Sequence, residues 1–172
     1  IKYSSDDGRF TIDEDGTLTA YTGNTSDLVI PNEVDGIPVT AIGDKCFSQM
    51  VGYSEASPDG INHDGYSNYL DTITLPASCK TLGRYAFSGC LGLTAVYGSV
   101  ENVGDYCFQN CWKMSDFDFS NTVSISNGAF YKTGLTEVNS ESVTTTGYAP
   151  FENIYDLTYI RLPNLEDRGM AE

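Results

Sequence analysis

Five cysteines and a single histidine are the side chains of this sequence best suited to nucleophilic or metal-dependent chemistry. No pair of cysteines has the C-x-x-C spacing that is typical of zinc sites or of thioredoxin-like sites. The histidine, His63, lies in the segment DGINHDG, where Gly, Asn and Asp favour turns. Neither G-x-S-x-G nor H-E-x-x-H occurs in the chain. We therefore predict no catalytic residue, no metal ligand and no cofactor, and we expect His63 to be an exposed loop residue.

The acidic run Asp13-Glu14-Asp15 before Gly16 has the composition of a calcium loop. A loop of the EF type needs oxygen ligands at alternate positions and a closing Glu, but this register ends on Thr22. Because apolar residues alternate on both sides of DEDGT, the segment predicts a hairpin turn instead. The triplet Asn24-Thr25-Ser26 matches a glycosylation acceptor, a pattern that is common by chance.

The charge of the chain excludes several classes of partner. Its formal net charge is -15, from 24 acidic and 9 basic residues, so phosphate backbones and anionic lipids are repelled. No apolar run is long enough for a spanning helix. We expect no nucleic-acid partner and no membrane insertion. The chain opens at Ile1 without a basic, apolar leader, and we expect that a signal peptide has already been removed.

A short phrase that ends in phenylalanine recurs along the chain, and four of its five copies carry glycine at the second position. From the second copy onward, the phenylalanines follow one another at steps of 21, 22 and 21 residues. That period lies within the range of about 20 to 29 residues that leucine-rich repeats show. The copies are Ile42–Phe47, Leu82–Phe87, Val103–Phe108, Ile125–Phe130 and Thr146–Phe151.

A second signature precedes each phrase and has the alternation of a short strand with one buried face. Its copies are Ser26–Pro31, Leu70–Pro76, Leu93–Gly98, Met114–Phe119, Leu135–Ser140 and Leu157–Pro163. In one phrase Ser126 replaces the glycine, an exchange that a helix N-cap tolerates and a left-handed residue does not. We therefore predict a short helical turn after each strand, with its phenylalanine pointing inward.

Such a rung cannot bury its apolar face alone, so the rungs must stack into a solenoid with parallel strands. The predicted fold is a leucine-rich repeat solenoid with short parallel strands on one face, short helical turns on the other and an N-terminal β-hairpin cap. We expect one domain over residues 1–172. Its parts are a hairpin cap (1–24), a first rung (25–48), an insertion loop (49–68), three to four full rungs (69–156) and a truncated last rung (157–172).

Two segments resemble a known family. Residues Leu70–Leu93, LDTITLPASCKTLGRYAFSGCLGL, closely resemble the BspA-type leucine-rich repeat, and Asp15–Phe47 resembles its N-terminal rung and hairpin cap. The resemblance covers the chain from about residue 10 to its end. It implies a bacterial or protist protein of the cell surface or the extracellular space, often involved in adhesion. It implies no particular ligand, and this sequence departs from the pattern in its insertion, its acidic fourth strand and its shortened last rung.

All five cysteines occupy columns that other rungs fill with small or apolar residues. Cys46 and Cys107 directly precede a column phenylalanine, Cys90 and Cys111 follow one by three residues, and Cys79 aligns with valines. We interpret them as buried, reduced thiols. Of these, Cys90 and Cys111 share one column on adjacent rungs, and we predict that they too stay reduced.

The outward positions of the strands should form a ladder on one face, which we call the strand face, and repeat proteins usually bind ligands on such a surface. Its second half concentrates carboxylates beside tyrosines, with Asp116, Asp118 and Glu137 expected on adjacent strands. Like charges that close repel, so a basic partner or a cation would stabilise them; the alternative is a solvated acidic face that serves solubility. The candidate ligand-binding residues are Tyr97, Asp116, Asp118, Glu137, Asn139, Tyr159 and Arg161.

The insertion is the second candidate surface, because it is long, rich in glycine and bears Tyr53, Tyr66 and Tyr69. Long loops are either functional or disordered, and the sequence leaves both open. We predict a non-enzymatic module of the cell surface or extracellular space that binds an extracellular protein or glycan. A structural spacer within a longer surface protein is the alternative, and an enzyme with an unrecognised site is a third reading. The oligomeric state stays open.

Overall fold

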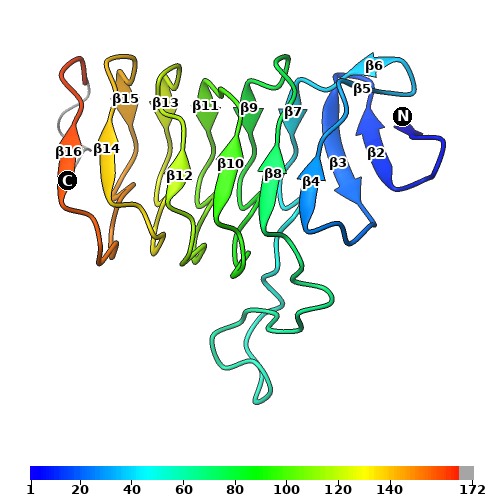
Figure 1. Cartoon of the computed structure of the whole chain (residues 1–172), viewed down its shortest axis with the longest axis horizontal. Helices are drawn as coiled ribbons and strands as arrows, with labels where there is room; N and C mark the ends of the chain where they lie inside the picture. Colours follow the sequence, from blue (N-terminus) through cyan, green and yellow to red (C-terminus); the bar gives the residue numbers. More distant parts are fainter. Residues whose placement is uncertain (167–172) are drawn as a thin grey trace.

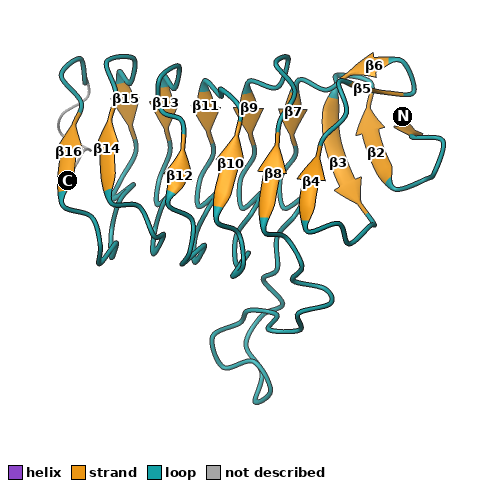
Figure 2. Ribbon diagram, viewed as in Figure 1, coloured by secondary structure: helices purple, strands orange, loops and turns teal. Residues whose placement is uncertain are grey.

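The computed structural model describes residues 1–166 as an elongated solenoid of short strands, with one long loop leaving its lower edge (Figure 1). Successive turns of chain place one strand on a back sheet and one on a front sheet (Figure 2). Within residues 1–166 there is no helix, and hence no helix that could cross a membrane. The chain is therefore a β-solenoid built from stacked turns.

The back sheet has eight strands in the order β1-β2-β3-β7-β9-β11-β13-β15. From β3 onward all neighbours are parallel, as stacking rungs require. The bounds are β1 (Lys2–Ser4), β2 (Phe10–Asp13), β3 (Thr17–Tyr21), β7 (Ala41–Ile42), β9 (Thr81–Leu82), β11 (Asn102–Val103), β13 (Ser124–Ile125) and β15 (Thr145–Thr146).

The front of the solenoid carries two parallel sheets, one of order β12-β10-β8-β4 and one of β14 with β16. A short antiparallel pair, β5 with β6, lies in the connection after the first front strand. The bounds are β4 (Asp27–Val29), β5 (Glu33–Val34), β6 (Ile37–Pro38), β8 (Thr72–Thr74), β10 (Ala95–Tyr97), β12 (Asp116–Phe117), β14 (Glu137–Asn139) and β16 (Tyr159–Arg161).

The predicted hairpin turn at DEDGT is confirmed, because β2 and β3 pair in antiparallel fashion across it. The carboxylate of Asp13 accepts hydrogen bonds from the N–H groups of Asp15 (2.9 Å) and Thr17 (3.0 Å), which explains the acidic composition. A separate hairpin cap is not supported, since β3 is itself a member of the parallel back sheet. The hairpin continues that sheet through the pairing of β3 with β7.

The column of phenylalanines is confirmed, and it forms the axis of the core. Ring centroids lie 5.2 Å apart from Phe47 to Phe87, 5.2 Å from Phe87 to Phe108, 5.3 Å from Phe108 to Phe130 and 5.8 Å from Phe130 to Phe151. The three middle rings have no exposed surface. Each rung therefore buries its ring against its neighbours, and no rung has a complete core of its own.

The predicted helical turns are wrong. The residue two before each column phenylalanine has a left-handed backbone, with φ between 46° and 59°, and a right-handed helix cannot pass through it. Backbone N–H groups of these turns bond to the next rung instead, as Tyr85 does to the carbonyl of Asp105 (2.9 Å) and Phe87 to that of Cys107 (2.9 Å). The turns thus form a third hydrogen-bonded ladder. The left-handed residues are Lys45, Tyr85, Tyr106, Gly128 and Ala149.

The glycine of the phrase serves close contact between rungs and not helix capping. A Cβ on Gly104 would lie 2.7 Å from the carbonyl carbon of Gly83, closer than real Cβ atoms come. A Cβ on Gly83 would lie equally close, at 2.7 Å, to that of Gly43. The backbones of successive turns therefore touch at this column. None of these three glycines is left-handed, as the exchange to Ser126 indicated.

The insertion leaves the stack between the turn after β7 and strand β8, and extends below the lower edge (Figure 1). Met50 and Ile61 pair at its base in an antiparallel bridge, and Ile61 is buried. Beyond the bridge, side chains close local turns: Asp59 accepts from the N–H of Ile61 (3.0 Å) and Asn62 from that of Asp64 (2.9 Å). The last predicted rung lies partly outside the described residues.

Candidate binding faces

The front strands hold the predicted outward residues in register. Asp27 pairs with Thr72, Thr72 with Ala95 and Ala95 with Asp116, while Glu137 pairs with Tyr159 on the last two strands. In each three-residue strand of the front except the last, β16, the middle residue is buried. The first and third residues of these strands are therefore the positions that belong to the strand face. The rings of Tyr97 and Tyr159 are about half exposed, at 47% and 49%.

The strand face differs from a continuous exposed ladder in two details. Ala95 lies in register with the outward Thr72 and Asp116 but is only 4% exposed, because its methyl group is too short to rise above its neighbours. The ladder is also not continuous, since β12 and β14 are not paired. At this break the middle position is the large Phe117, whose ring packs edge-on against Phe108 (5.5 Å) and Phe130 (5.1 Å). Asp116 and Glu137 therefore lie on either side of a break between two sheets.

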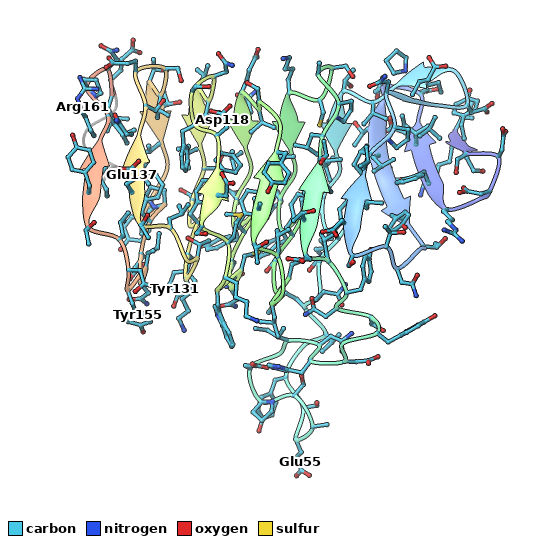
Figure 3. All side chains as sticks on the ribbon, viewed as in Figure 1. Glu55, Asp118, Tyr131, Glu137, Tyr155 and Arg161 are labelled. Carbon is cyan, nitrogen blue, oxygen red and sulfur yellow. The ribbon has the colours of Figure 1, made fainter. Side chains whose placement is uncertain are left out.

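The polar side chains of the second half are exposed, and Figure 3 shows Asp118, Glu137 and Arg161 together on the front. Asp118 lies just after β12 and accepts the N–H of Ser120 (2.9 Å), so it also closes a turn. Arg161 donates to Glu141 (2.5 Å) and, more weakly, to Asn139 (3.4 Å). Because this guanidinium already has acceptors within the chain, the carboxylates of Asp116 and Glu137 beside the break are the part of the strand face more available to a partner.

The three tyrosines of the insertion fall into two environments. Tyr53 and Tyr66 are 81% and 73% exposed, as a contact surface requires. Tyr69 is half buried at the base, with its ring 6.2 Å from that of Tyr21, and burial raises the pKa of its hydroxyl. Tyr69 is thus mainly a packing residue, whereas the other two face solvent.

The cysteines are free thiols, and all but the half-buried Cys46 are fully buried. The thiols of Cys90 and Cys111 donate to the carbonyls of Phe47 and Phe87, each at 3.1 Å, so both contribute hydrogen bonds between rungs. Burial raises the pKa of Cys46 to about 12 and that of Cys79 to about 11. Thiols in this state are poor nucleophiles.

His63 is exposed, as predicted, with 52% of its side chain accessible. Its Nε2 atom lies 2.7 Å from a carboxylate oxygen of Asp59, and this hydrogen bond lowers the pKa of that carboxyl group. Both residues belong to the insertion, so the pair joins two parts of one loop. It contacts none of the cysteines.

The sequence analysis missed a set of exposed aromatic residues along the turn edge, which we define as the turns at residues 43–50, 83–92, 104–113, 126–134 and 147–156. Figure 3 shows Tyr131 and Tyr155 on this lower edge. Trp112 is 48% exposed and Tyr155 88%, and the rings of Tyr85 and Tyr106 stack at 5.4 Å. The recurrence of Tyr85 and Tyr106 two residues before a column phenylalanine was the signal that could have revealed part of this edge.

Comparison with known proteins identifies the repeat. The sequence profile of the BspA type leucine-rich repeat region matches residues 61–168, in six copies. No curated protein matches the chain in sequence. The match covers well over half of the chain and includes every rung after the insertion.

Solved bacterial structures share the fold. The leucine-rich repeat protein TpLRR of T. pallidum is 22% identical, with a TM-score of 0.73 over 95% of this chain and 68% of that protein. A leucine-rich repeat protein of Bacteroides ovatus is 19% identical, with a TM-score of 0.67 over 95% of this chain and 39% of its own. A leucine-rich cell surface protein of Faecalibacterium prausnitzii is 21% identical, with a TM-score of 0.54 over 96% of this chain and 55% of its own.

Proposed function

This chain belongs to the BspA-type leucine-rich repeat family, and from its exposed faces we propose that it is a module that binds an extracellular protein or glycan. The observation that carries the proposal is the strand face. Parallel strands hold exposed tyrosines and carboxylates at fixed positions on a stiff surface. Side chains held in place lose little conformational entropy when a partner binds.

The acidic residues give the strand face a preference among partners. Asp116, Asp118 and Glu137 are exposed, and the chain as a whole has a net charge of -15. A partner with a basic patch is therefore attracted at long range and bound more tightly at low salt. The exposed Tyr53 and Tyr66 of the insertion offer a second contact to the same class of partner.

We propose that the chain is not an enzyme. Its single histidine is paired with an aspartate in a loop, and its thiols are held protonated by burial. These environments remove the nucleophiles on which thiol-dependent catalysis relies. A spacer role in a longer surface protein is the second candidate, and the length and regularity of the stack favour it (Figure 1).

We further propose that the chain acts at the cell surface or in the extracellular space. The family to which it belongs supports this, and the F. prausnitzii structure is described as a cell surface protein. Immunofluorescence on intact cells of the source organism, compared with permeabilised cells, tests the proposal. Staining that appears only after permeabilisation, and not on intact cells, would place the chain inside the cell.

The binding proposal is tested by a screen of extracellular-matrix proteins and glycan arrays at two ionic strengths. We expect binding that weakens at high salt and is lost when Asp116, Asp118 and Glu137 are all replaced by Lys. The matched control replaces three exposed acids far from the face by Lys, and its binding should be unchanged. The control residues are Asp6, Glu14 and Glu33.

If the triple variant of the strand face binds as well as the control, the face is not the binding site. If no protein and no glycan binds the unmodified chain at either ionic strength, the spacer role is favoured over the binding module.

A further inference from the structure

The turn edge carries a groove near the C-terminal end of the stack, with a volume of about 350 Å³. The aromatic side chains of Trp112 and Tyr155 form part of its lining. Polar side chains with both donors and acceptors complete the lining. They come from two successive turns and are Lys132, Thr133, Asn153 and Asp156.

Thr133 is the unusual member of this lining. It is only 5% exposed, and its hydroxyl has no hydrogen-bond partner within the described residues. The same column holds Cys90 and Cys111, whose thiols do find a partner, the carbonyl of a phenylalanine one rung back. A buried hydroxyl without a partner is costly, and a ligand that supplies one removes that cost. Because the hydroxyl oxygen itself is covered, a ligand in the groove reaches it after a change of rotamer about the Cα–Cβ bond.

The groove does not suit a peptide bound as an added strand. The backbone N–H groups of these turns are already used between rungs, with Lys132 bonded to the carbonyl of Glu152 (3.1 Å) and Asn110 to that of Tyr131 (2.9 Å). A peptide would therefore find no free backbone edge to extend. Anionic polymers are disfavoured by the net charge of -15.

From these observations we propose that the turn-edge groove binds a neutral sugar residue of a glycan. A pyranose ring has an apolar C–H face that packs on an aromatic ring, and a rim of hydroxyls that both donate and accept hydrogen bonds. Trp112 and Tyr155 supply the aromatic surfaces. Thr133, Asn153 and Asp156 supply polar partners for the rim.

A second, smaller groove on the same edge extends the site. It has a volume of about 260 Å³ and is lined in part by Tyr106, Tyr148 and Glu152. Tyr131 lines it, and the neighbouring Lys132 lines the first groove, with its ammonium 5.3 Å from the centre of the Tyr131 ring. Because adjoining residues line the two grooves, a linear glycan can place successive sugars along the edge. This site is separate from the strand face.

Trp112 is the single tryptophan of the chain, so its fluorescence reports on this groove alone. The experiment titrates the whole chain with hexasaccharides of glucose, mannose and xylose, and with an oligogalacturonate as the anionic probe. We expect a saturable change in emission with at least one neutral probe and none with the anionic one. Tyr155→Ala should weaken that binding about tenfold, as the loss of one aromatic contact predicts.

Thr133→Val separates a binding role from a structural one, because valine has the same shape without the hydroxyl. We expect weaker sugar binding together with unchanged or higher thermal stability, since an unpartnered buried hydroxyl is removed. Val123→Ala, an exposed apolar residue that lines neither groove, is the control and should bind as the unmodified chain does.

The proposal is overturned if no neutral probe changes the emission of Trp112. It is equally overturned if Tyr155→Ala and Thr133→Val both bind sugar as tightly as the Val123→Ala control. Tighter binding of the oligogalacturonate than of any neutral probe would contradict the neutral ligand class. Each of these results leaves the strand-face proposal intact.

Discussion

The stacked rungs and the insertion are parts of one chain that are held together by different forces. In the stack, aromatic rings lie 5.2 to 5.8 Å apart along one column, and backbone ladders join each rung to the next. In the insertion, side-chain carboxylates and amides close local turns around one buried isoleucine. The destabilising effect of a substitution in the stack should therefore spread to neighbouring rungs, whereas the effect of a substitution in the insertion should stay within that loop.

Removal of one column ring should produce the largest effect. Phe108→Ala leaves a cavity between two rings in a rigid stack, and we expect a loss of about 3 to 5 kcal/mol in the free energy of unfolding. Tyr53→Ala at the insertion should change it by less than about 0.5 kcal/mol. Urea denaturation followed by circular dichroism measures both. A loss for Phe108→Ala no larger than that of the insertion variant would remove the distinction.

A methyl group added between two rungs should have the next largest effect. The Cβ of Gly104→Ala would meet backbone atoms of the preceding turn at 2.7 to 2.9 Å, and we expect a cost of about 1 to 3 kcal/mol. Gly65→Ala in the insertion is the matched control, because nothing lies within 4 Å of its Cβ and its φ is not left-handed. The two melting temperatures, measured under one condition, should therefore separate clearly. Equal values would show that the rungs do not touch at this column.

The thiols, all of which lie in the stack, should make its stability depend on alkaline pH. Burial raises the pKa of Cys79 to about 11 in the folded state, so the unfolded chain loses this proton first, from about pH 9. The folded state then holds more protons, and stability declines as pH rises between about 9 and 11, by at most about 1.4 kcal/mol per pH unit for each thiol. Cys79→Val should make this decline shallower. An unchanged slope in urea titrations from pH 8 to 11 would argue against the buried thiol.

Shortening of the insertion should have the smallest effect. Residues 51–60 can be replaced by an Asn-Gly turn that joins Met50 to Ile61, which are already paired in a bridge. The closure entropy of a loop changes slowly with length, so we expect a shift of less than about 1 kcal/mol in the free energy of unfolding. Differential scanning calorimetry measures it. A loss as large as that of Phe108→Ala would mean that the insertion supports the stack.

The sequence was sufficient for the features that repeat. The period of the phenylalanines predicted the column, and the strand signature predicted the register of the front strands. Both signals are strong because several copies agree, and because stacking requires equivalent residues to meet. The buried positions of Cys90 and Cys111 followed from the same alignment.

The errors came from features that one rung does not contain. The helical turns were predicted from the exchange of glycine for Ser126, which was interpreted as a helix N-cap. Hydrogen bonds to the next rung and the left-handed residue, as at Tyr85 and Tyr106, decide the turn instead. The break of the front ladder arises where Phe117 packs against the column, a contact between segments that the period does not describe. The turn-edge groove is assembled from Trp112 and Tyr155 on different rungs, so no single motif indicates it.

The column of rings is tested most directly by a pair of double-mutant cycles with Phe→Leu substitutions, measured by urea denaturation. Phe87 and Phe108 are adjacent, at 5.2 Å, and we predict a coupling energy of about 0.5 to 1.5 kcal/mol. Phe47 and Phe130 are separated by two rings of the column, and their effects should add to within about 0.5 kcal/mol. Additivity in the adjacent pair, or equal coupling in both pairs, would contradict a single stacked column.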